Sequence, residues 1–174
     1  MDSLKQKIRS IPDFPKKGIM FRDITTLLQD PKATKKAIQG MLKPFENEKI
    51  DAVIGTEARG FIFGAIIAFE LGVSFVPVRK PGKLPFRTEK AVYEKEYGTD
   101  ELEMHSDSIK KGDNVLIVDD LLATGGTGKA VAELAEKLGG KIAGFCFLIE
   151  LSFLNGREKL KPYRVFSLID FTSE

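Results

Sequence analysis

The sequence predicts an α/β protein whose mainly parallel central sheet is flanked by helices, and two observations carry this prediction. Apolar runs rich in β-branched residues alternate with longer helical patterns, which is typical of parallel strands joined by crossover helices. Those runs are apolar nearly throughout, as strands must be when both faces of a sheet are covered. The chain has 174 residues, a length that suits a single domain with its own hydrophobic core.

The same patterns place the expected elements along the chain. Strands are expected at residues 51–55, 74–78, 114–119, 142–149 and 164–169. Helices are expected at residues 31–45, 60–71 and 127–138. The last helix should stop before Gly139 and Gly140, because glycine readily adopts the left-handed conformation that ends helices.

Two segments fall outside this alternation. Residues 1–30 contain IPDFPKKGIMFRD, with prolines and a glycine among apolar residues, and we expect them to form a small cap over the sheet. Residues 80–99 are polar and turn-rich where a short connection would suffice. Loops of this length in compact domains are often lids or binding loops. A solvated β-excursion is the alternative interpretation.

Composition argues against several classes of protein. The chain has 27 lysines and arginines against 25 aspartates and glutamates, a balance that does not indicate a nucleic-acid binder. No stretch approaches the roughly 18 apolar residues of a membrane span, and the first residues lack the apolar segment of a secretory signal. Cys146 lies in an apolar run and is expected in the core, and a lone cysteine fits a reducing compartment. We therefore expect a soluble, cytoplasmic protein that binds neither nucleic acid nor membrane.

The run VLIVDDLLATGGT at residues 115–127 predicts an anion site. In an open parallel sheet, ligands bind at the carboxyl ends of the strands. Gly125 and Gly126 leave room for backbone N–H groups to surround an anion, and the following helix adds its positive end. Thr124 and Thr127 supply hydroxyl groups, and Thr127 could also cap the helix.

Two carboxylates, Asp119 and Asp120, stand at the expected end of the preceding strand. Acceptor-only groups there suit a pair of vicinal sugar hydroxyls, directly or through a hydrated Mg²⁺. The alternative is a strand-end aspartate pair beside an ordinary glycine turn. The glycine spacing matches neither a Walker loop nor a dinucleotide-binding fingerprint.

Taken whole, the thirteen-residue run resembles the 5-phosphoribosyl 1-pyrophosphate (PRPP) motif of type I phosphoribosyltransferases. Further segments resemble those of the adenine phosphoribosyltransferases, in the same order: PDFPKKGIMFRDITT at 12–26, EARGF at 57–61, PVRKPGKLP at 77–85, YEKEYG at 93–98 and LIELS at 148–152. The resemblance implies the type I phosphoribosyltransferase fold over residues 1–174, with a hood at 1–30 and a mobile lid loop at 83–99. It also implies a homodimer that uses Mg²⁺ to convert adenine and PRPP into AMP and pyrophosphate in purine salvage.

The resemblance assigns the PRPP-binding residues. The 5-phosphate would be held by Ala123, Thr124, Gly125, Gly126 and Thr127. Asp119 and Asp120 would face the ribose hydroxyls, and Mg²⁺ would be held mainly through the substrate. Pyrophosphate would be bound by Arg59, Arg79, Lys80 and Lys83.

Chemistry supports Arg59 most directly among these cations. A guanidinium fork matches phosphate oxygens, and a cation at a helix start opposes the helix dipole unless an anion binds there. For Arg79, Lys80 and Lys83, a solvated basic face is the alternative. Glu57, in the same turn as Arg59, is interpreted as structural.

The resemblance also assigns the adenine site. Met20, Phe21 and Arg22 would hold the base, mainly with backbone groups at the purine edge, and Leu121 would close the other face of the ring. The alternative is that the apolar members are ordinary core residues, because a slot for a flat base and a core cluster look alike in sequence. Relatives that act on 6-oxopurines commonly carry an aspartate where this chain has Ala123, which argues against hypoxanthine and guanine.

Glu96, in YEKEYG, matches the carboxylate proposed to exchange a proton with adenine N7 under a closed lid. From the residues alone, Glu94 would rank nearly equal. His105 is interpreted as a surface or strand residue.

Two rival functions remain: a sister enzyme that uses xanthine, orotate or another base, and a regulator that keeps the PRPP pocket as a sensor and binds nucleic acid. The nearly balanced charge argues against the regulator.

Overall fold

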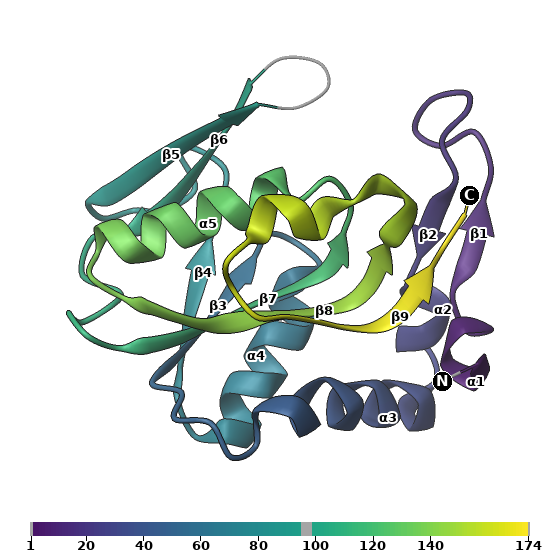
Figure 1. The fold of residues 1–174 in the computed structure, drawn as a ribbon, viewed down its shortest axis with the longest axis horizontal. Coiled ribbons are helices and arrows are strands. Elements are labelled where there is room, and N and C mark those ends of the chain that lie inside the picture. Colours follow the sequence, from purple (N-terminus) through teal and green to yellow (C-terminus); the bar gives the residue numbers. More distant parts are fainter. Residues whose placement is uncertain (1, 95–98, 174) are drawn as a thin grey trace.

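A computed structural model describes residues 2–94 and 99–173 of the chain, and its centre is a five-stranded sheet (Figure 1). The strands lie in the order β4-β3-β7-β8-β9, and every neighbouring pair is parallel. Their bounds are β3 Ala52–Thr56, β4 Ser74–Val78, β7 Asn114–Leu122, β8 Lys141–Leu151 and β9 Val165–Phe171. The predicted parallel sheet is confirmed, and each predicted strand is present.

Strand β7 runs further than predicted. The sequence suggested an end at Asp119, but β7 continues to Leu122 because it keeps pairing with β8 after β3 has ended. The ladder between β3 and β7 stops at Val118, whereas Leu122 still pairs with Glu150 of β8. Asp119 and Asp120 therefore lie within β7, at a level where β7 pairs with β8 but no longer with β3.

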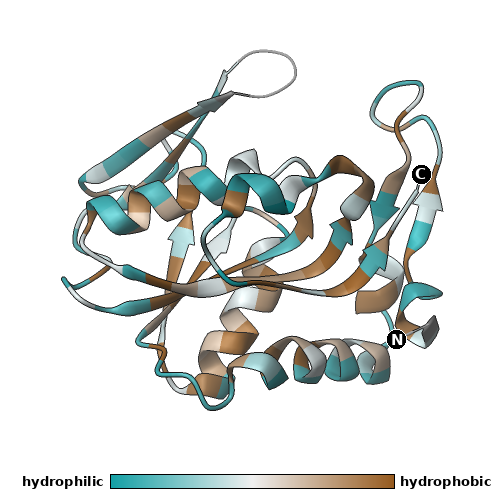
Figure 2. Ribbon diagram, viewed as in Figure 1, coloured by the Kyte–Doolittle hydropathy of each residue, from teal (hydrophilic) through white to brown (hydrophobic). Residues whose placement is uncertain are grey.

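Helices cover both faces of the sheet (Figure 1). Helices α3 Pro31–Leu42 and α4 Gly60–Leu71 lie on one face, and α5 Gly126–Lys137 lies on the other. In β7, Leu116 and Val118 join the core beneath α3 and α4, while Val115 and Ile117 join the core beneath α5. Successive strand residues point to opposite faces, so burial on both sides explains the hydrophobic central strands in Figure 2.

The helix boundaries follow local signals. Helix α3 starts after Asp30, whose carboxylate accepts hydrogen bonds from the N–H groups of Lys32 at 3.0 Å and Ala33 at 3.1 Å. It ends at Leu42 rather than at Phe45 as predicted, and a short 3₁₀ turn, η1 Lys43–Phe45, follows. Pro44 accounts for the early end, because it has no N–H to continue the helix. Helix α4 has the predicted bounds, and no helix in the described part of the chain is long and apolar enough to span a membrane.

Residues 2–30 include a two-stranded sheet that is separate from the main one. They contain α1 Asp2–Lys5, β1 Arg9–Ile11, β2 Phe21–Asp23 and α2 Thr25–Leu28. Strands β1 and β2 pair antiparallel and lie beside the carboxyl end of β9, where the C-terminus is found (Figure 1). Arg22 joins the two parts, because its guanidinium stacks 4.0 Å from the Phe171 ring and donates to the Ser173 carbonyl at 3.3 Å.

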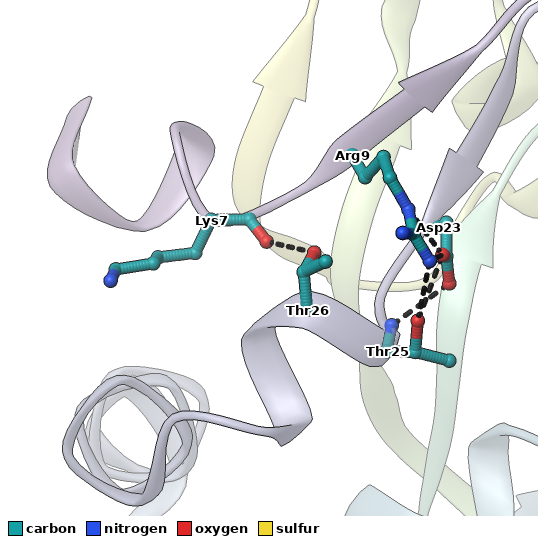
Figure 3. A network of polar contacts seen from close by, with 5 residues as sticks. All are labelled: Lys7, Arg9, Asp23, Thr25 and Thr26. Carbon is teal, nitrogen blue, oxygen red and sulfur yellow. Dashed lines mark hydrogen bonds and ion pairs between the residues drawn. The ribbon is translucent and has the colours of Figure 1, made fainter.

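A polar network centred on Asp23 holds this segment together (Figure 3). The Asp23 carboxylate accepts from the backbone N–H of Thr25 at 2.9 Å, the Thr25 hydroxyl at 2.8 Å and Arg9 Nε at 3.0 Å. The Thr26 hydroxyl donates to the Lys7 carbonyl at 2.6 Å. The hydrogen bond from the Thr25 N–H, together with those from Arg9 and the Thr25 hydroxyl, lowers the pKa of Asp23 from 3.8 to about 2.

Strands β5 Thr88–Glu94 and β6 Thr99–His105 form an antiparallel pair outside the main sheet. The prediction of an irregular loop at 80–99 was wrong over β5, and the β-excursion alternative describes this part better. The sequence shows little apolar alternation here because charge pairs join the two strands: Lys90 Nζ lies 2.7 Å from Glu101 and 2.9 Å from Glu103. The pair packs against α5 and projects beyond the sheet (Figure 1).

Candidate active site

The candidate site lies where the carboxyl ends of β3 and β7 meet. The chain leaves β3 through α4 toward β4 on one side, and it leaves β7 through α5 on the opposite face toward β8. Ligands of open α/β sheets bind at such a switch point. A cavity of about 230 Å³ opens there, lined by Thr56, Glu57, Ala58, Arg59, Lys80, Tyr93, Asp100, Leu102, Asp119, Asp120 and Thr127. A second cavity of about 210 Å³ shares Arg59, Asp119, Asp120 and Thr127 and continues over residues 121–128.

Asp119 and Asp120 form the acidic centre of this cavity. The backbone N–H of Asp120 donates to Asp119 Oδ1 at 2.8 Å, and the Thr56 hydroxyl also hydrogen-bonds the Asp119 carboxylate. Burial raises the pKa of Asp119 well above its ordinary value, and the neighbouring charge of Asp120 raises it further. Burial also raises the pKa of Asp120, against the opposing effect of the Arg59 charge. The site therefore holds negative charge at a cost that a bound cation or hydroxyl donors would relieve.

Gly60 lets the start of α4 approach Asp119. A Cβ atom at Gly60 would lie 2.6 Å from Asp119 Oδ1, closer than side-chain carbons come to other atoms. The helix therefore meets the carboxylate with its main chain, at the end where its dipole favours negative charge. Gly60 is not among the predicted site residues, although its place in EARGF directly after Arg59 was the available signal.

Arg59 connects the sheet edge to the hood. It stands at the N-cap position of α4, and its Nε lies 2.9 Å from Asp120 Oδ2. Its guanidinium also lies 5.0 Å from the centre of the Phe21 ring, a cation–π contact with the hood strand β2. The structure thus brings together three residues that the sequence assigned to pyrophosphate, ribose and adenine.

The other predicted cations divide into two groups. Arg79 and Lys83 both pair with Glu57, at 2.8 Å from Oε2 and 2.7 Å from Oε1, whereas Lys80 lines the cavity with its Nζ 3.9 Å from Asp100. Burial acts to raise the pKa of Glu57, but hydrogen bonds from Lys83 and Arg79 outweigh it and lower the pKa. Glu57, interpreted from sequence only as structural, is therefore the anchor of a basic segment at residues 79–83.

The loop at residues 123–126 turns tightly into α5. Gly125 has φ +80° and is the N-cap residue, so the prediction that Thr127 caps the helix was wrong. A left-handed conformation is required at 125, and glycine supplies it without strain. Thr127 lies in the first turn of α5, and its hydroxyl is 3.3 Å from the Tyr93 hydroxyl of β5. The second cavity is lined by all five residues predicted for the phosphate: Ala123, Thr124, Gly125, Gly126 and Thr127.

The hood residues face different ways. Phe21 is partly buried and stacks edge-on against Phe14, with ring centres 5.1 Å apart, beside Arg59. The Arg22 guanidinium is committed to Ser10, Ser173 and Phe171, none of which lines either cavity. The Arg22 side chain is therefore not placed to meet a base. The predicted contact with the purine edge is left to the backbone of this residue.

The remaining predicted residues are placed as follows. Met20 is partly buried just before β2, and Leu121 is partly buried at the rim of the second cavity. Glu96 lies outside the described residues. His105 is the last residue of β6, as the strand interpretation expected, and lines neither cavity. Tyr93, which sequence analysis missed, lines the first cavity because β5 is a strand rather than a loop.

The donor set at this edge suits a hard cation. Asp119 and Asp120 offer carboxylate oxygens, which Mg²⁺ prefers. Within residues 2–94 and 99–173, no group of three or more histidine, cysteine, aspartate or glutamate side chains is arranged to hold a metal ion. The two carboxylates thus fit an ion whose remaining ligands come from elsewhere.

Comparisons with known proteins agree with this arrangement. A family model described as a phosphoribosyl transferase domain matches residues 23–173. The chain is 59% identical over 169 residues to an adenine phosphoribosyltransferase of Acetivibrio thermocellus, covering 97% of this chain and 99% of the relative. It is similar to the crystal structure of adenine phosphoribosyltransferase from Thermoanaerobacter pseudethanolicus, with a TM-score of 0.96 and 56% identity over 98% of this chain and 99% of that one. The enzyme from Saccharomyces cerevisiae, solved with an imino-altritol bisphosphate and adenine, matches with a TM-score of 0.90 and 44% identity over 96% and 97%.

Proposed function

This chain belongs to the adenine phosphoribosyltransferases, type I phosphoribosyltransferases that make AMP and pyrophosphate from adenine and PRPP, and we propose that it does so in the cavity between β3 and β7. One observation carries the proposal. The carboxylates of Asp119, which is partly buried, and Asp120, which is buried, stand between a loop suited to one phosphate and a group of cations suited to others. PRPP presents the same order of groups, with a ribose between its 5-phosphate and its pyrophosphate.

The 5-phosphate binds the loop at residues 123–127. The first N–H groups of α5 have no partners within the helix and point out of its start, where the helix dipole also favours an anion. The hydroxyls of Thr124 and Thr127 add donors. Asp119 and Asp120 then accept hydrogen bonds from the ribose hydroxyls, which relieves the cost of keeping both carboxylates ionised.

Pyrophosphate binds on the side of Arg59 and Lys80. Both line the cavity, and the Arg59 side chain is 34% exposed although it pairs with Asp120. Arg79 and Lys83 lie next to this side through Glu57 and strengthen its positive field. Mg²⁺, held mainly through the substrate beside Asp119 and Asp120, would neutralise charge on the phosphate oxygens.

Adenine binds between the hood and the end of β7. Phe21 covers one face of the ring and Leu121 the other, while the backbone of residues 20–22 meets the purine edge. Ala123 supplies no carboxylate near adenine N7. Glu96 on the lid therefore exchanges the proton with N7. Adenine N9 attacks the anomeric carbon as the bond to pyrophosphate breaks, and the lid at 83–99 excludes water that would hydrolyse the activated sugar.

The enzyme acts as a homodimer in the cytoplasm. Helix α4 (GFIFGAIIAFEL) is apolar apart from Glu70 in its last turn, yet Ile62 is 38% exposed and Phe69 is 83% exposed. A helix of this kind is normally covered on all sides, which supports a protein partner over this face. Sedimentation of wild type and of Phe69→Glu tests the dimer.

Cys146 is fully buried and forms no disulfide, which fits a reducing compartment such as the cytoplasm.

A panel of bases tests the function. With PRPP and Mg²⁺, adenine should give AMP with a kcat/KM at least about 100-fold above hypoxanthine, guanine, xanthine and orotate, because Ala123 stands where relatives that act on 6-oxopurines commonly carry an aspartate. Product identity is read by chromatography against AMP, IMP and GMP standards. Turnover of a 6-oxopurine at a comparable rate would make this chain a sister enzyme. PRPP binding with no turnover of any base would favour the regulator.

A further inference from the structure

The phosphate loop at residues 123–127 rests on a short helical turn that follows β8. This turn is η3 Gly156–Leu160. A Cβ atom at Gly125 would lie 2.3 Å from the Gly156 carbonyl oxygen, and one at Gly156 would lie 2.1 Å from the Ala123 carbonyl oxygen. No side chain fits at either position, so the two main chains touch directly. The positions of η3 and of the loop are therefore coupled through this main-chain contact.

One side chain ties η3 to the sheet. Arg157 forms a fork on Glu150 of β8, with Nε 2.6 Å from Oε1 and Nη2 2.6 Å from Oε2. Its Nη1 donates to the Val165 carbonyl of β9 at 2.8 Å. A bidentate pair fixes direction as well as distance, so Arg157 holds the start of η3 in one orientation against two strands.

The partner of Arg157 is placed next to the strand that carries the loop. Glu150 is 4% exposed, and it pairs in register with Leu122, the last residue of β7 before Ala123. A continuous chain of contacts thus runs from β7 through the phosphate loop to Gly156, and then through Arg157 and Glu150 back to β7. Removing Arg157 would leave the carboxylate of Glu150 buried and unpaired, and η3 would lose this connection to β8.

We propose that the Glu150–Arg157 ion pair is a positioning device for the 5-phosphate. By holding Gly156 against the loop, it keeps the loop N–H groups aimed at the phosphate before the substrate arrives, which lowers the cost of ordering them on binding. Neither residue lines the active-site cavities, so both act through the loop. The inference rests on the proposed assignment of residues 123–127 to the 5-phosphate.

Kinetics of Arg157→Gln test the inference. The KM for PRPP and the Kd for AMP should each rise about tenfold, while the KM for adenine and kcat at saturating PRPP stay within about twofold. Arg157→Lys should fall between, because an ammonium keeps the charge but loses the fork. Glu150→Gln should act in the same direction as Arg157→Gln. A purely structural role would lower the active fraction, and hence kcat, without separating PRPP from adenine.

Arg164→Gln is the matched control. Its guanidinium also pairs with a carboxylate and a carbonyl, Glu48 at 2.8 Å and Pro44 at 2.9 Å, but these partners lie in and just after η1, and not in β7, β8, η3 or the phosphate loop. This variant should leave the PRPP KM and the AMP Kd unchanged. An equal rise in both variants would show general loosening of the fold and overturn the inference.

Thr127→Val separates failure of the inference from failure of the proposed function. If Thr127→Val weakens AMP binding and Arg157→Gln does not, the loop binds the phosphate but the ion pair does not position it. If neither variant weakens AMP binding, the assignment of the loop itself is wrong. Should Arg157→Gln fail to fold, the same measurements on Arg157→Lys decide by the same criteria.

Discussion

The two sides of the active-site cavity are built by different means. On the side of the loop at 123–127, main chain packs on main chain, and Gly125 and Gly156 have no room for a side chain. On the side of the basic segment, side chains set the shape, because Glu57 holds Arg79 and Lys83 by ion pairs. Main-chain packing is in place before a ligand arrives, whereas ion pairs can exchange one anion for another. The contrast suggests a preformed site for the 5-phosphate and an adjustable one for pyrophosphate.

The junction of the two sides should show the largest effect. Asp119→Asn should lower kcat/KM by on the order of 1000-fold, because the ribose loses a charged acceptor. The pKa of Asp119 is raised in the folded state, so its ionised form destabilises the fold at neutral pH. The variant should therefore be at least as stable as wild type, as measured by denaturant unfolding at pH 7.

Glu133→Gln on α5 is the matched control for this carboxylate, since its side chain is 53% exposed. It should change neither activity nor stability appreciably. A wild-type rate in Asp119→Asn would remove this residue from the site, and a marked loss of stability would mean that its charge supports the fold.

The main-chain side is tested by Gly125→Ala. The new Cβ would meet the Gly156 carbonyl at 2.3 Å, and φ +80° is unfavourable for alanine, so the loop must move. A displacement near 1 Å at a phosphate site costs about 100-fold in kcat/KM for PRPP. Gly72→Ala shares a positive φ, at the end of α4 away from the cavities, and controls for backbone strain alone. Equal losses in the two variants would contradict a special role for the loop.

The ion-pair side should respond less. Glu57→Gln removes the charge that anchors Arg79 and Lys83, and we expect the KM for PRPP to rise about tenfold with adenine KM unchanged. The rise should shrink with added salt, because ion pairs are screened. Steady-state kinetics from low to high ionic strength measure both effects, with Glu48→Gln as a remote control. An unchanged PRPP KM would show that this segment does not serve pyrophosphate.

The smallest catalytic effect is expected from the hood network around Asp23. Asp23→Asn should cost about 2 kcal/mol of unfolding free energy at pH 7, because it weakens charge-assisted hydrogen bonds, with kcat nearly unchanged. The pKa of Asp23 is depressed to about 2, so its stabilisation is present above the ordinary value of 3.8 and is lost as the pH falls through about 2. The stability difference between variant and wild type should follow that course in urea titrations. A difference independent of pH would contradict it.

Sequence reasoning succeeded where local pattern and tertiary burial agree. Helix α4 and strand β4 have the predicted bounds, because each is an apolar run between turn-forming residues. The motif at 115–127 and Arg59 pointed to one sheet edge, and the structure brings them to the same cavity.

It failed where contacts between distant residues decide. Strand β5 is held by charge pairs, so its sequence shows little apolar alternation. The cap of α5 depends on a left-handed Gly125 that packs on Gly156, and nothing local signals that contact. The pairing of Arg59 with Asp120 could not be foreseen either, because each was assigned separately to a different part of the substrate.

The docking of the hood on β9 has a consequence for how the chain is made. Arg22 is separated by 151 positions from Ser173, to which it donates a hydrogen bond, and its guanidinium stacks on Phe171. During synthesis, the hood leaves the ribosome early, but its packing surface exists only after the final strand has emerged. The part of the active site that would cover the base should therefore be the last to assemble, after the parallel sheet has already formed the phosphate loop.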